Sequence, residues 1–343
     1  MPRRTLIASS AASVAALVIV CAAVYVVFVR DDALPAEGDQ IAYSCKEQNN
    51  DWYAICVSNV NGSDRRRITT RTQASTPAWS SDGQQIAFTR NEDVGEYTTF
   101  SEDDVFVMDA DGDDTRQLTP EQDGKHRGQP TWSPDGRQIA YILGPNVPTG
   151  QPSRPGSLFV MDADGGNVRR LTRGDADVDP AWSPDGKEIA YGHCFGIDSP
   201  TFCTLDLFIL DVATGNSRQL TRTPFFYEAG YTWSPDSSRI AFTRWTPPAD
   251  VNPLASIYAI NRGGTGETLL HEHMNYVGGL YSLAWSPDGR TLAFETSPNR
   301  ECTAISLLDV SSSDVLSLTS CERARESTRS PAWQPDVEAQ DAH

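Results

Sequence analysis

The chain has 343 residues, of which 39% are hydrophobic, and its 46 acidic against 28 basic residues give a formal net charge of −18 at pH 7. This length allows one large core with an appendage. A chain with this excess of negative charge repels the phosphate backbone of nucleic acids, and we therefore expect no nucleic-acid partner.

The N-terminal segment predicts a membrane anchor. Residues 6–29 carry no charged side chain, and a helix of that length crosses a hydrocarbon core about 30 Å thick. Arg3 and Arg4 precede the segment and acidic residues follow it, so the positive-inside rule leaves residues 1–5 in the cytoplasm. A cleaved signal peptide is the alternative, but its apolar region spans only about 7–15 residues. We expect a signal-anchor helix over 6–29, with the rest of the chain on the extracytoplasmic side, in the cell envelope, periplasm or outer surface.

After a tether over residues 30–38, the chain from 39 to 336 is built on one repeat. Its tryptophan recurs at about fifty residues, as Trp79, Trp132, Trp182, Trp233, Trp285 and Trp333. Within one copy, Pro130–Ser133 is a short apolar strand, and Ser-Pro-Asp-Gly after it suits a type I turn. The runs Gln138–Leu143 and Ser157–Asp162 are β-type. Asp164-Gly165 is a hairpin signal, and Val168–Thr172 supplies a fourth, charged strand suited to an outer edge.

Each copy therefore predicts one four-stranded antiparallel blade, and stacked blades share a continuous core. The first copy, Ile41–Tyr43, has no tryptophan strand before it, and the last such strand, Ser330–Asp336, has nothing after it. We expect Pro331–Trp333 to become the innermost strand of the first blade. The fold prediction is an all-β, six-bladed β-propeller closed by its C-terminal strand and preceded by one transmembrane helix, with residues 337–343 as a disordered tail.

The motif pair P-x-W-S-P-D-G-x-x-I-A-[FY] and [IL]-[FY]-V-M-D-A-D-G…R-x-L-T resembles the WD-repeat-like repeat of TolB-type β-propellers, also described as a PD40-type repeat. The propellers of prolyl-oligopeptidase-type peptidases carry similar units. The resemblance covers roughly residues 38–336. It implies an extracytoplasmic propeller that binds proteins at the cell envelope. TolB-type proteins also have an α/β domain before the propeller, and only a tether precedes Gln40 here, so their partners cannot simply be transferred.

Six of the seven cysteines lie outside the apolar segment, in sequence-local pairs. Each pair falls within one predicted blade, which suits an oxidising compartment. We predict three disulfides, Cys45–Cys56, Cys194–Cys203 and Cys302–Cys321; buried free thiols in a cytosolic protein are the alternative.

Alternating strand direction places the short Ser-Pro-Asp-Gly and Asp-Gly turns on one face of the disc. The long, dissimilar connections all lie on the other, and long loops on a rigid scaffold usually carry binding. Aromatic anchors rimmed by acids suit a partner with apolar and basic character, although several rings could instead pin their loops to the blade below. The partner-binding candidates are Tyr97, Phe100, Phe195, Phe225, Phe226, Tyr227, Trp245 and Tyr276.

Metal and catalytic signals are weak. Asp109, Asp111 and Asp113 resemble the opening of a calcium loop, but the glycine and glutamate that complete one are missing. His271 and His273 lie two residues apart without a third ligand for zinc. There is no G-x-S-x-G elbow, and among the residues expected before the channel strands, which include Tyr231 and Leu283, Asp179 is the only acid. We predict no metal, no cofactor and no enzymatic activity.

The resulting hypothesis is a membrane-anchored, extracytoplasmic, TolB-like propeller that serves as a protein-interaction scaffold through its long-loop face. A glycan or small-ligand sensor that binds at the channel mouth is the alternative, and a hydrolase is a third reading.

Overall fold

The computed structural model describes residues 39–46, 52–70, 73–91, 100–101, 103–119, 125–145, 147–148, 155–174, 176–195, 204–224, 226–245, 254–275, 282–299, 302–319 and 327–336. Residues 1–38, with the predicted anchor and tether, and the tail 337–343 lie outside them. Within the described ranges, no helix has the length and apolar character needed to cross a membrane.

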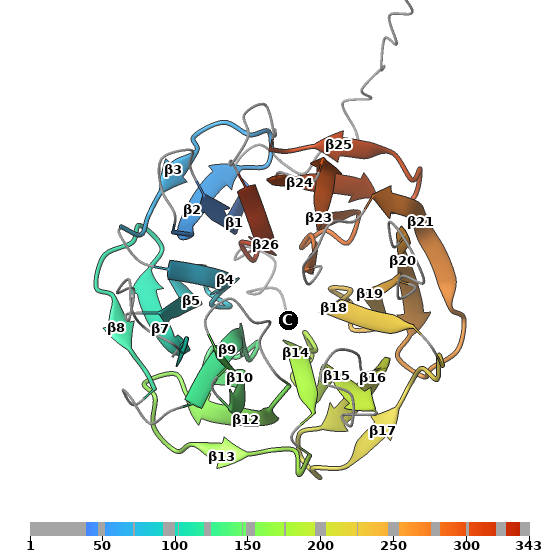
Figure 1. Ribbon diagram of the computed structural model, residues 1–343, viewed down its shortest axis with the longest axis horizontal. Coiled ribbons are helices and arrows are strands. Elements are labelled where there is room, and N and C mark those ends of the chain that lie inside the picture. Colours follow the sequence, from blue (N-terminus) through green and yellow to red (C-terminus); the bar gives the residue numbers. More distant parts are fainter. Residues whose placement is uncertain are drawn as a thin grey trace, which may run out of the picture. The chain divides into compact units, whose positions relative to one another are not determined.

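Six four-stranded antiparallel sheets form the blades of a ring (Figure 1). Blade 1 consists of β26 (Ser327–Trp333), β1 (Gln40–Lys46), β2 (Ala54–Asn59) and β3 (Arg66–Arg67). Blade 2 consists of β4 (Gln73–Trp79), β5 (Gln85–Asn91), β7 (Asp103–Asp109) and β8 (Arg116–Gln117). Blade 3 consists of β9 (Lys125–Trp132), β10 (Gln138–Pro145), β12 (Ser157–Asp162) and β13 (Arg169–Arg170).

The second half of the ring repeats this order. Blade 4 consists of β14 (Asp177–Trp182), β15 (Glu188–Phe195), β16 (Thr204–Asp211) and β17 (Ser217–Gln219). Blade 5 consists of β18 (Tyr227–Trp233), β19 (Arg239–Trp245), β20 (Leu254–Asn261) and β21 (Thr268–Asn275). Blade 6 consists of β22 (Leu283–Trp285), β23 (Thr291–Asn299), β24 (Cys302–Asp309) and β25 (Val315–Ser317).

The predicted closure is confirmed. β26 pairs antiparallel with β1, with Ile41 opposite Trp333 and Cys45 opposite Thr328, so the C-terminal strand becomes the innermost strand of blade 1. The backbone N–H of Gln334 also donates to the carbonyl of Gln40 at 2.9 Å. The N-terminal and C-terminal strands of the propeller therefore belong to one sheet.

The repeat tryptophans form the core between blades. Each packs against the preceding blade, as Trp79 does against Ala42, Ile55 and Val57. The alanine of the I-A-[FY] motif explains the fit, because a side chain as small as that of Ala42 leaves room for an indole from the next blade. Trp333 closes the series by packing on blade 6, so one apolar cluster spans every pair of neighbouring blades.

The Ser-Pro-Asp-Gly motif builds each turn from side-chain hydrogen bonds. In blade 3, the Ser133 hydroxyl donates to Asp135 Oδ1 at 2.6 Å and accepts from the Gln138 N–H at 2.9 Å. Asp135 Oδ1 also accepts from the Arg137 N–H at 3.1 Å, and these donors hold the pKa of Asp135 below its ordinary value, the Ser133 hydroxyl most of all. Gly136 closes the turn at a φ of 67°, which a residue without Cβ adopts readily. The acids of this motif are thus turn components.

The first strand of blade 3 is longer than the sequence indicated. The strand predicted over Pro130–Ser133 is β9, which runs from Lys125 to Trp132. A β-bulge interrupts this strand, and Gln129 has a φ of 57° there. The same left-handed conformation recurs three residues before the tryptophan in four other blades, at Thr76, Asp179, Gly230 and Ser330.

Candidate interaction face

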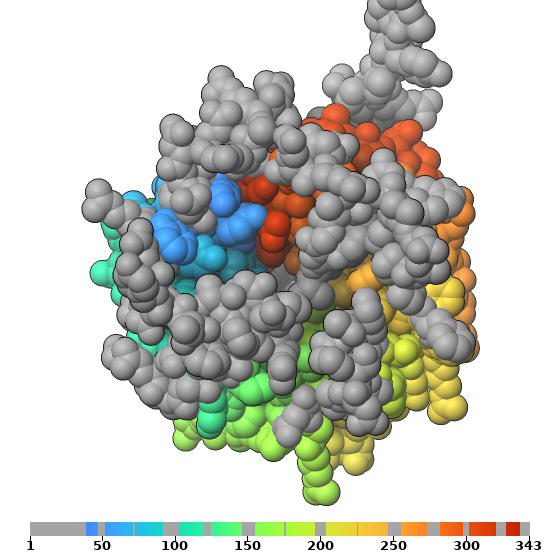
Figure 2. Space-filling view, in the orientation of Figure 1, coloured from blue at the N-terminus to red at the C-terminus, as the bar shows by residue number. Residues whose placement is uncertain are grey.

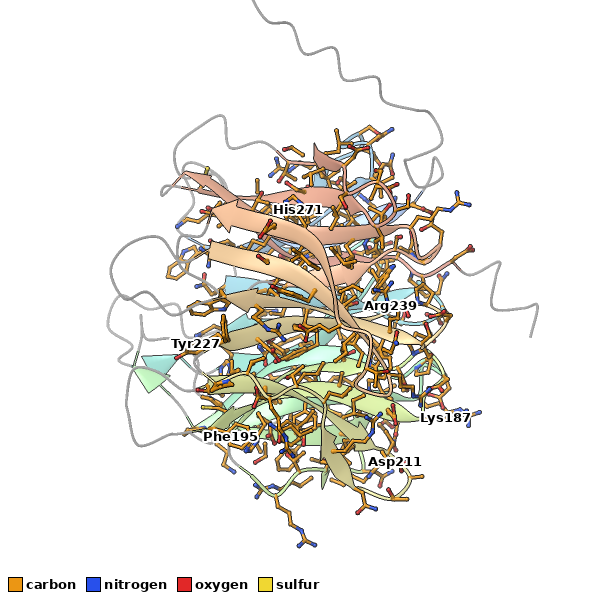
Figure 3. All side chains as sticks on the ribbon, turned by 90° about the vertical axis from the view of Figure 1, so that its right-hand side faces the viewer. Lys187, Phe195, Asp211, Tyr227, Arg239 and His271 are labelled. Carbon is orange, nitrogen blue, oxygen red and sulfur yellow. A yellow bond between two sulfur atoms is a disulfide. The ribbon has the colours of Figure 1, made fainter. Side chains whose placement is uncertain are left out.

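The two faces of the disc are distinguished by the strand ends that they carry. Lys187 and Asp211 lie at the start of β15 and the end of β16, on the short-turn face, whereas Phe195 and Tyr227 lie at the opposite ends of their blades (Figure 3). We call the second surface the long-loop face, defined by the ends of the second strands and the starts of the first and third strands.

The structure places four of the predicted partner-binding side chains. Phe195, Tyr227 and Trp245 lie at strand ends on the long-loop face, and Phe226 immediately precedes β18. The predicted interblade loop around Tyr227 is therefore wrong in part, because this residue already begins a strand. Phe100 belongs to a short strand but its side chain is not described, and Tyr97, Phe225 and Tyr276 lie outside the described residues.

Tyr227 and Trp245 form a stacked pair on blade 5. Their ring centroids are 4.4 Å apart with an interplanar angle of 18°, and their residues are directly opposite in the β18–β19 ladder. Both rings are half-buried. Stacking and cross-strand pairing fix both rings on rigid strands, so they present a preformed aromatic surface.

A buried ion pair joins the strand neighbours of these two residues, Glu228 and Arg244, whose side chains point to the other side of the blade. Glu228 is fully buried and its Oε1 lies 2.7 Å from Arg244 Nη2. Burial raises the pKa of Glu228, opposed chiefly by the Arg244 charge. Arg244 also bonds Glu267 at 2.7 Å and lies 4.6 Å from the Tyr258 ring centroid. The residues next to Tyr227 and Trp245 are thus held in a network that leaves little rotational freedom.

Blade 4 carries a second aromatic group, built on a histidine. His193 Nδ1 lies 2.7 Å from Asp177 Oδ1, and Asp177, 1% exposed, also accepts a hydrogen bond from the Thr172 hydroxyl. Since a carboxylate accepts this bond, Nδ1 carries the proton. The Phe195 ring packs edge-on against His193 at 5.0 Å and remains 41% exposed. Phe195 is therefore a positioned, solvent-facing ring.

The connections of blades 2 and 3 are joined by a small sheet that the sequence did not indicate. β6 (Phe100–Ser101) pairs antiparallel with β11 (Val147–Pro148). These strands lie in the second-to-third strand connections of adjacent blades. One residue of the proline-rich connection in blade 3, Pro148, takes part in this pairing.

At the centre of the ring, side chains of one blade cap the bulges of the next. The N–H groups of Thr76 and Gln129 donate to Ser44 Oγ and Thr89 Oγ1, each at 3.3 Å. The Asp179 N–H donates to Gln129 Oε1 at 3.0 Å. In blade 5 the bulge residue is Gly230, not the predicted Tyr231, and its N–H donates to Asp179 Oδ2 at 3.2 Å.

Two acids in this central ring titrate abnormally. Burial raises the pKa of Asp179 to about 6. Burial also raises the pKa of Glu295, 5% exposed, to about 7, with opposition from Arg329 and from the Ser330 N–H that Glu295 caps. Asp179 is the only acid among the residues expected before the channel strands. The sequence analysis did not consider Glu295, which enters from a second strand, β23, rather than from a first strand.

One predicted disulfide is confirmed: Cys45 and Cys56 are bonded, with Cα atoms 5.8 Å apart. They link β1 to β2 within blade 1. Cys194 and Cys302 are also disulfide-bonded. Their predicted partners, Cys203 and Cys321, lie outside the described residues, so those two pairings stay predictions.

The metal-like motifs are explained by local structure. The carboxylate of Asp111 accepts the Asp113 N–H at 3.1 Å within a tight turn, and His271 packs against the Phe294 ring at 5.9 Å. Within the described ranges, no group of three or more His, Cys, Asp or Glu side chains is placed to hold a metal ion.

Six four-stranded blades form a closed ring, with the first strand of each blade at the centre, and this arrangement defines a six-bladed β-propeller. Residues 33–194 match the family model described as TolB beta propeller domain. The resemblance to TolB-type propellers inferred from the repeat is thereby confirmed, and the same ring is found in solved structures. A search of curated proteins gave no match.

The solved structures similar to this chain include the following three. TolB from Acinetobacter baumannii is 20% identical, with a TM-score of 0.67 over 89% of this chain and 69% of that chain. A putative TolB from Agrobacterium tumefaciens is 17% identical, with a TM-score of 0.56 over 82% of this chain and 89% of the other. A Mycobacterium tuberculosis puromycin-hydrolyzing peptidase is 12% identical, with a TM-score of 0.51 over 82% of this chain and 45% of that one. These likenesses show the fold.

Proposed function

We propose that this chain is a membrane-anchored, extracytoplasmic, TolB-like propeller that binds a protein partner in the cell envelope through its long-loop face. The observation that carries the proposal is the pair of aromatic groups on adjacent blades: Phe195 on blade 4, and Tyr227 with Trp245 on blade 5. Rigid aromatic anchors over a fixed scaffold are the usual centre of a protein interface. We propose a binding role and no enzymatic one.

Affinity recovery from solubilised membranes tests the interface. We expect Phe195→Ala, at an exposed ring, to reduce recovery of the bound protein by about tenfold, the effect of losing one interface anchor. Lys187→Ala, at an exposed side chain of the short-turn face, is the matched control and should change nothing. Equal recovery with both variants, at unchanged thermal stability, would show that the long-loop face is not the interface. Stabilisation by sugars or cell-wall fragments, with no protein recovered, would favour the ligand-sensor alternative.

Extraction and processing test the anchor separately. The full chain is expected to stay in the membrane pellet after alkaline carbonate treatment, with its N-terminal residues intact. A mature protein whose sequence begins after residue 20 would show that the apolar segment is a cleaved signal instead.

A further inference from the structure

The outermost strand of blade 5 differs from that of every other blade. β21 has eight residues, whereas the outermost strands β3, β8, β13, β17 and β25 have two or three. Figure 1 shows β21 as the long arrow on the outer rim. Among the described residues, no strand pairs with its outer edge. Long open edges are normally shortened, charged or covered, because their N–H and C=O groups are a template for another strand.

The side chains of the rim change at the same place. The outermost strands of blades 1 to 4 each carry arginine, at Arg66, Arg67, Arg116, Arg169, Arg170 and Arg218. Neither β21 nor β25 contains a lysine or an arginine. The outermost strands of blades 5 and 6 thus lack basic side chains, although β21 carries Glu272, so the lysine or arginine that commonly protects an edge from pairing is missing there.

Apolar side chains take the place of the arginines. Leu269 on β21 is 47% exposed, and Val315 and Leu316 on β25 are 44% and 40% exposed. The turn before β25 reaches β21, since the Ser313 hydroxyl in that turn donates to the Leu270 carbonyl at 3.3 Å. Figure 2 shows this orange to orange-red rim at the right and upper right of the disc. We call Leu269, Val315 and Leu316 the rim patch.

The surroundings of the rim patch are acidic. Glu267 precedes β21, Glu272 lies within it, and Asp314 precedes β25; all three are exposed. Arg244 neutralises Glu267 only in part, because it also pairs with the buried Glu228. One further base, Arg239, bonds Thr268 at the start of β21. An incoming segment would therefore meet a backbone edge that no described strand covers, apolar side chains and three exposed carboxylates.

We propose that the outer edge of β21 is a docking site for an extended segment of a partner protein, with alternating apolar and basic side chains, that adds a fifth antiparallel strand to blade 5. Main-chain hydrogen bonds supply affinity in this mode, and alternate side chains supply specificity. The apolar side chains of the segment cover the rim patch, and its basic side chains face Glu272 and Asp314. This site lies on the rim and is independent of the long-loop face.

A designed peptide of eight residues, the length of β21, with alternating valine and lysine tests this in fluorescence anisotropy against the intact propeller. We expect binding that protects the β21 amides from hydrogen exchange. A peptide of the same charge with a central proline cannot pair along its length and is expected to bind at least tenfold more weakly, as is a valine–glutamate peptide. The proline peptide separates strand pairing from simple attraction to an acidic protein.

Protein variants complete the test. Leu269→Arg recreates the charged edge of blades 1 to 4 and is expected to weaken the valine–lysine peptide at least tenfold. Val168→Arg is the matched control, because Val168 precedes β13 on the rim and is 52% exposed; it should bind as the wild type does. Equal binding of the proline peptide, equal effects of both variants, or no protection of β21 would overturn the proposal. So would a dimer that Leu269→Arg dissociates, since a second copy would then be the occupant.

Discussion

Replacing Trp333 with alanine is expected to open the ring between its first and last blades. Trp333 is 7% exposed and lies in one apolar cluster with Ile41 and Tyr43 of blade 1 and with Ile305 and Leu307 of blade 6. It is the tryptophan of the only strand that the C-terminal end of the chain contributes to blade 1. Its loss removes packing on both sides of the seam.

The magnitude follows from the burial and from one hydrogen bond. A buried indole removes about 150–250 Å² from water, which at about 25 cal/mol per Å² is roughly 4–6 kcal/mol. Core Trp→Ala substitutions cost about 3–5 kcal/mol. The Trp333 indole N–H donates to the Ala284 carbonyl at 2.9 Å, and losing that bond adds about 1 kcal/mol. We expect Trp333→Ala to lower the free energy of unfolding by about 4–6 kcal/mol, a large part of typical stability.

Urea denaturation followed by tryptophan fluorescence measures this change. A matched pair isolates the hydrogen bond: Trp333→Phe loses it, whereas Trp182→Phe does not, because the Trp182 indole nitrogen has no partner among the described residues. We expect Trp333→Phe to be more destabilised by about 1 kcal/mol. If Trp333→Ala unfolds at the wild-type urea midpoint with an unchanged slope, the C-terminal strand does not close the ring.

Three further predictions concern buried polar and covalent links. Burial raises the pKa of Glu295 from 4.5 to about 7, so its contribution to the free energy of unfolding is fully present below about pH 4.5 and is lost as the pH rises through about 7. This loss amounts to about 3 kcal/mol, and Glu295→Gln should abolish it in urea titrations at several pH values. A pH profile of stability that the substitution leaves unaltered would contradict the prediction. Arg244→Met should cost about 3–5 kcal/mol by leaving Glu228 charged and buried, and adding Glu228→Gln should recover part of it; no recovery would argue against the pair. Replacing Cys45 and Cys56 together with alanine should cost about 2–4 kcal/mol, a difference that a reducing agent should remove in thermal unfolding.

The repeat predicted most of the fold because its residues interact either within one turn or between equivalent strands of the repeat. Ser133 and Asp135 form hydrogen bonds within a single turn. The strand of Trp333 pairs with the strand of Ile41, as the first and second strands of a blade do. The bulges were not predictable in this way. Thr76 and Asp179 adopt left-handed backbone conformations that non-glycine residues rarely favour, and the groups that cap their N–H lie in the preceding blade, about thirty to fifty residues away along the chain.

The candidate site was predictable only as a face. The length of the connections was enough to predict which face carries the site. The contacts that hold its aromatic side chains in place are made by residues distant in the sequence. The sequence placed Tyr227 in a connection between blades, and nothing near it in the sequence indicated that Glu228 would pair with Arg244 on the neighbouring strand. The β21 edge could not be predicted for the same reason. From the sequence, Leu269 resembles a core residue; only the structure shows that it is exposed and that no described strand pairs with the outer edge of β21.

The central caps imply that the blades unfold together. Each cap joins one blade to the next, from Ser44 to Thr76 through to Glu295 and Ser330, and the tryptophan clusters span the same interfaces farther out. A blade that detaches therefore exposes apolar surface on both sides and breaks the caps that it shares with both neighbouring blades. This coupling favours cooperative unfolding of the propeller. A scaffold with this coupling gives the long-loop face and the β21 edge fixed positions relative to each other. One propeller could then hold two partners at a defined separation, a role that two independent flexible modules could not perform.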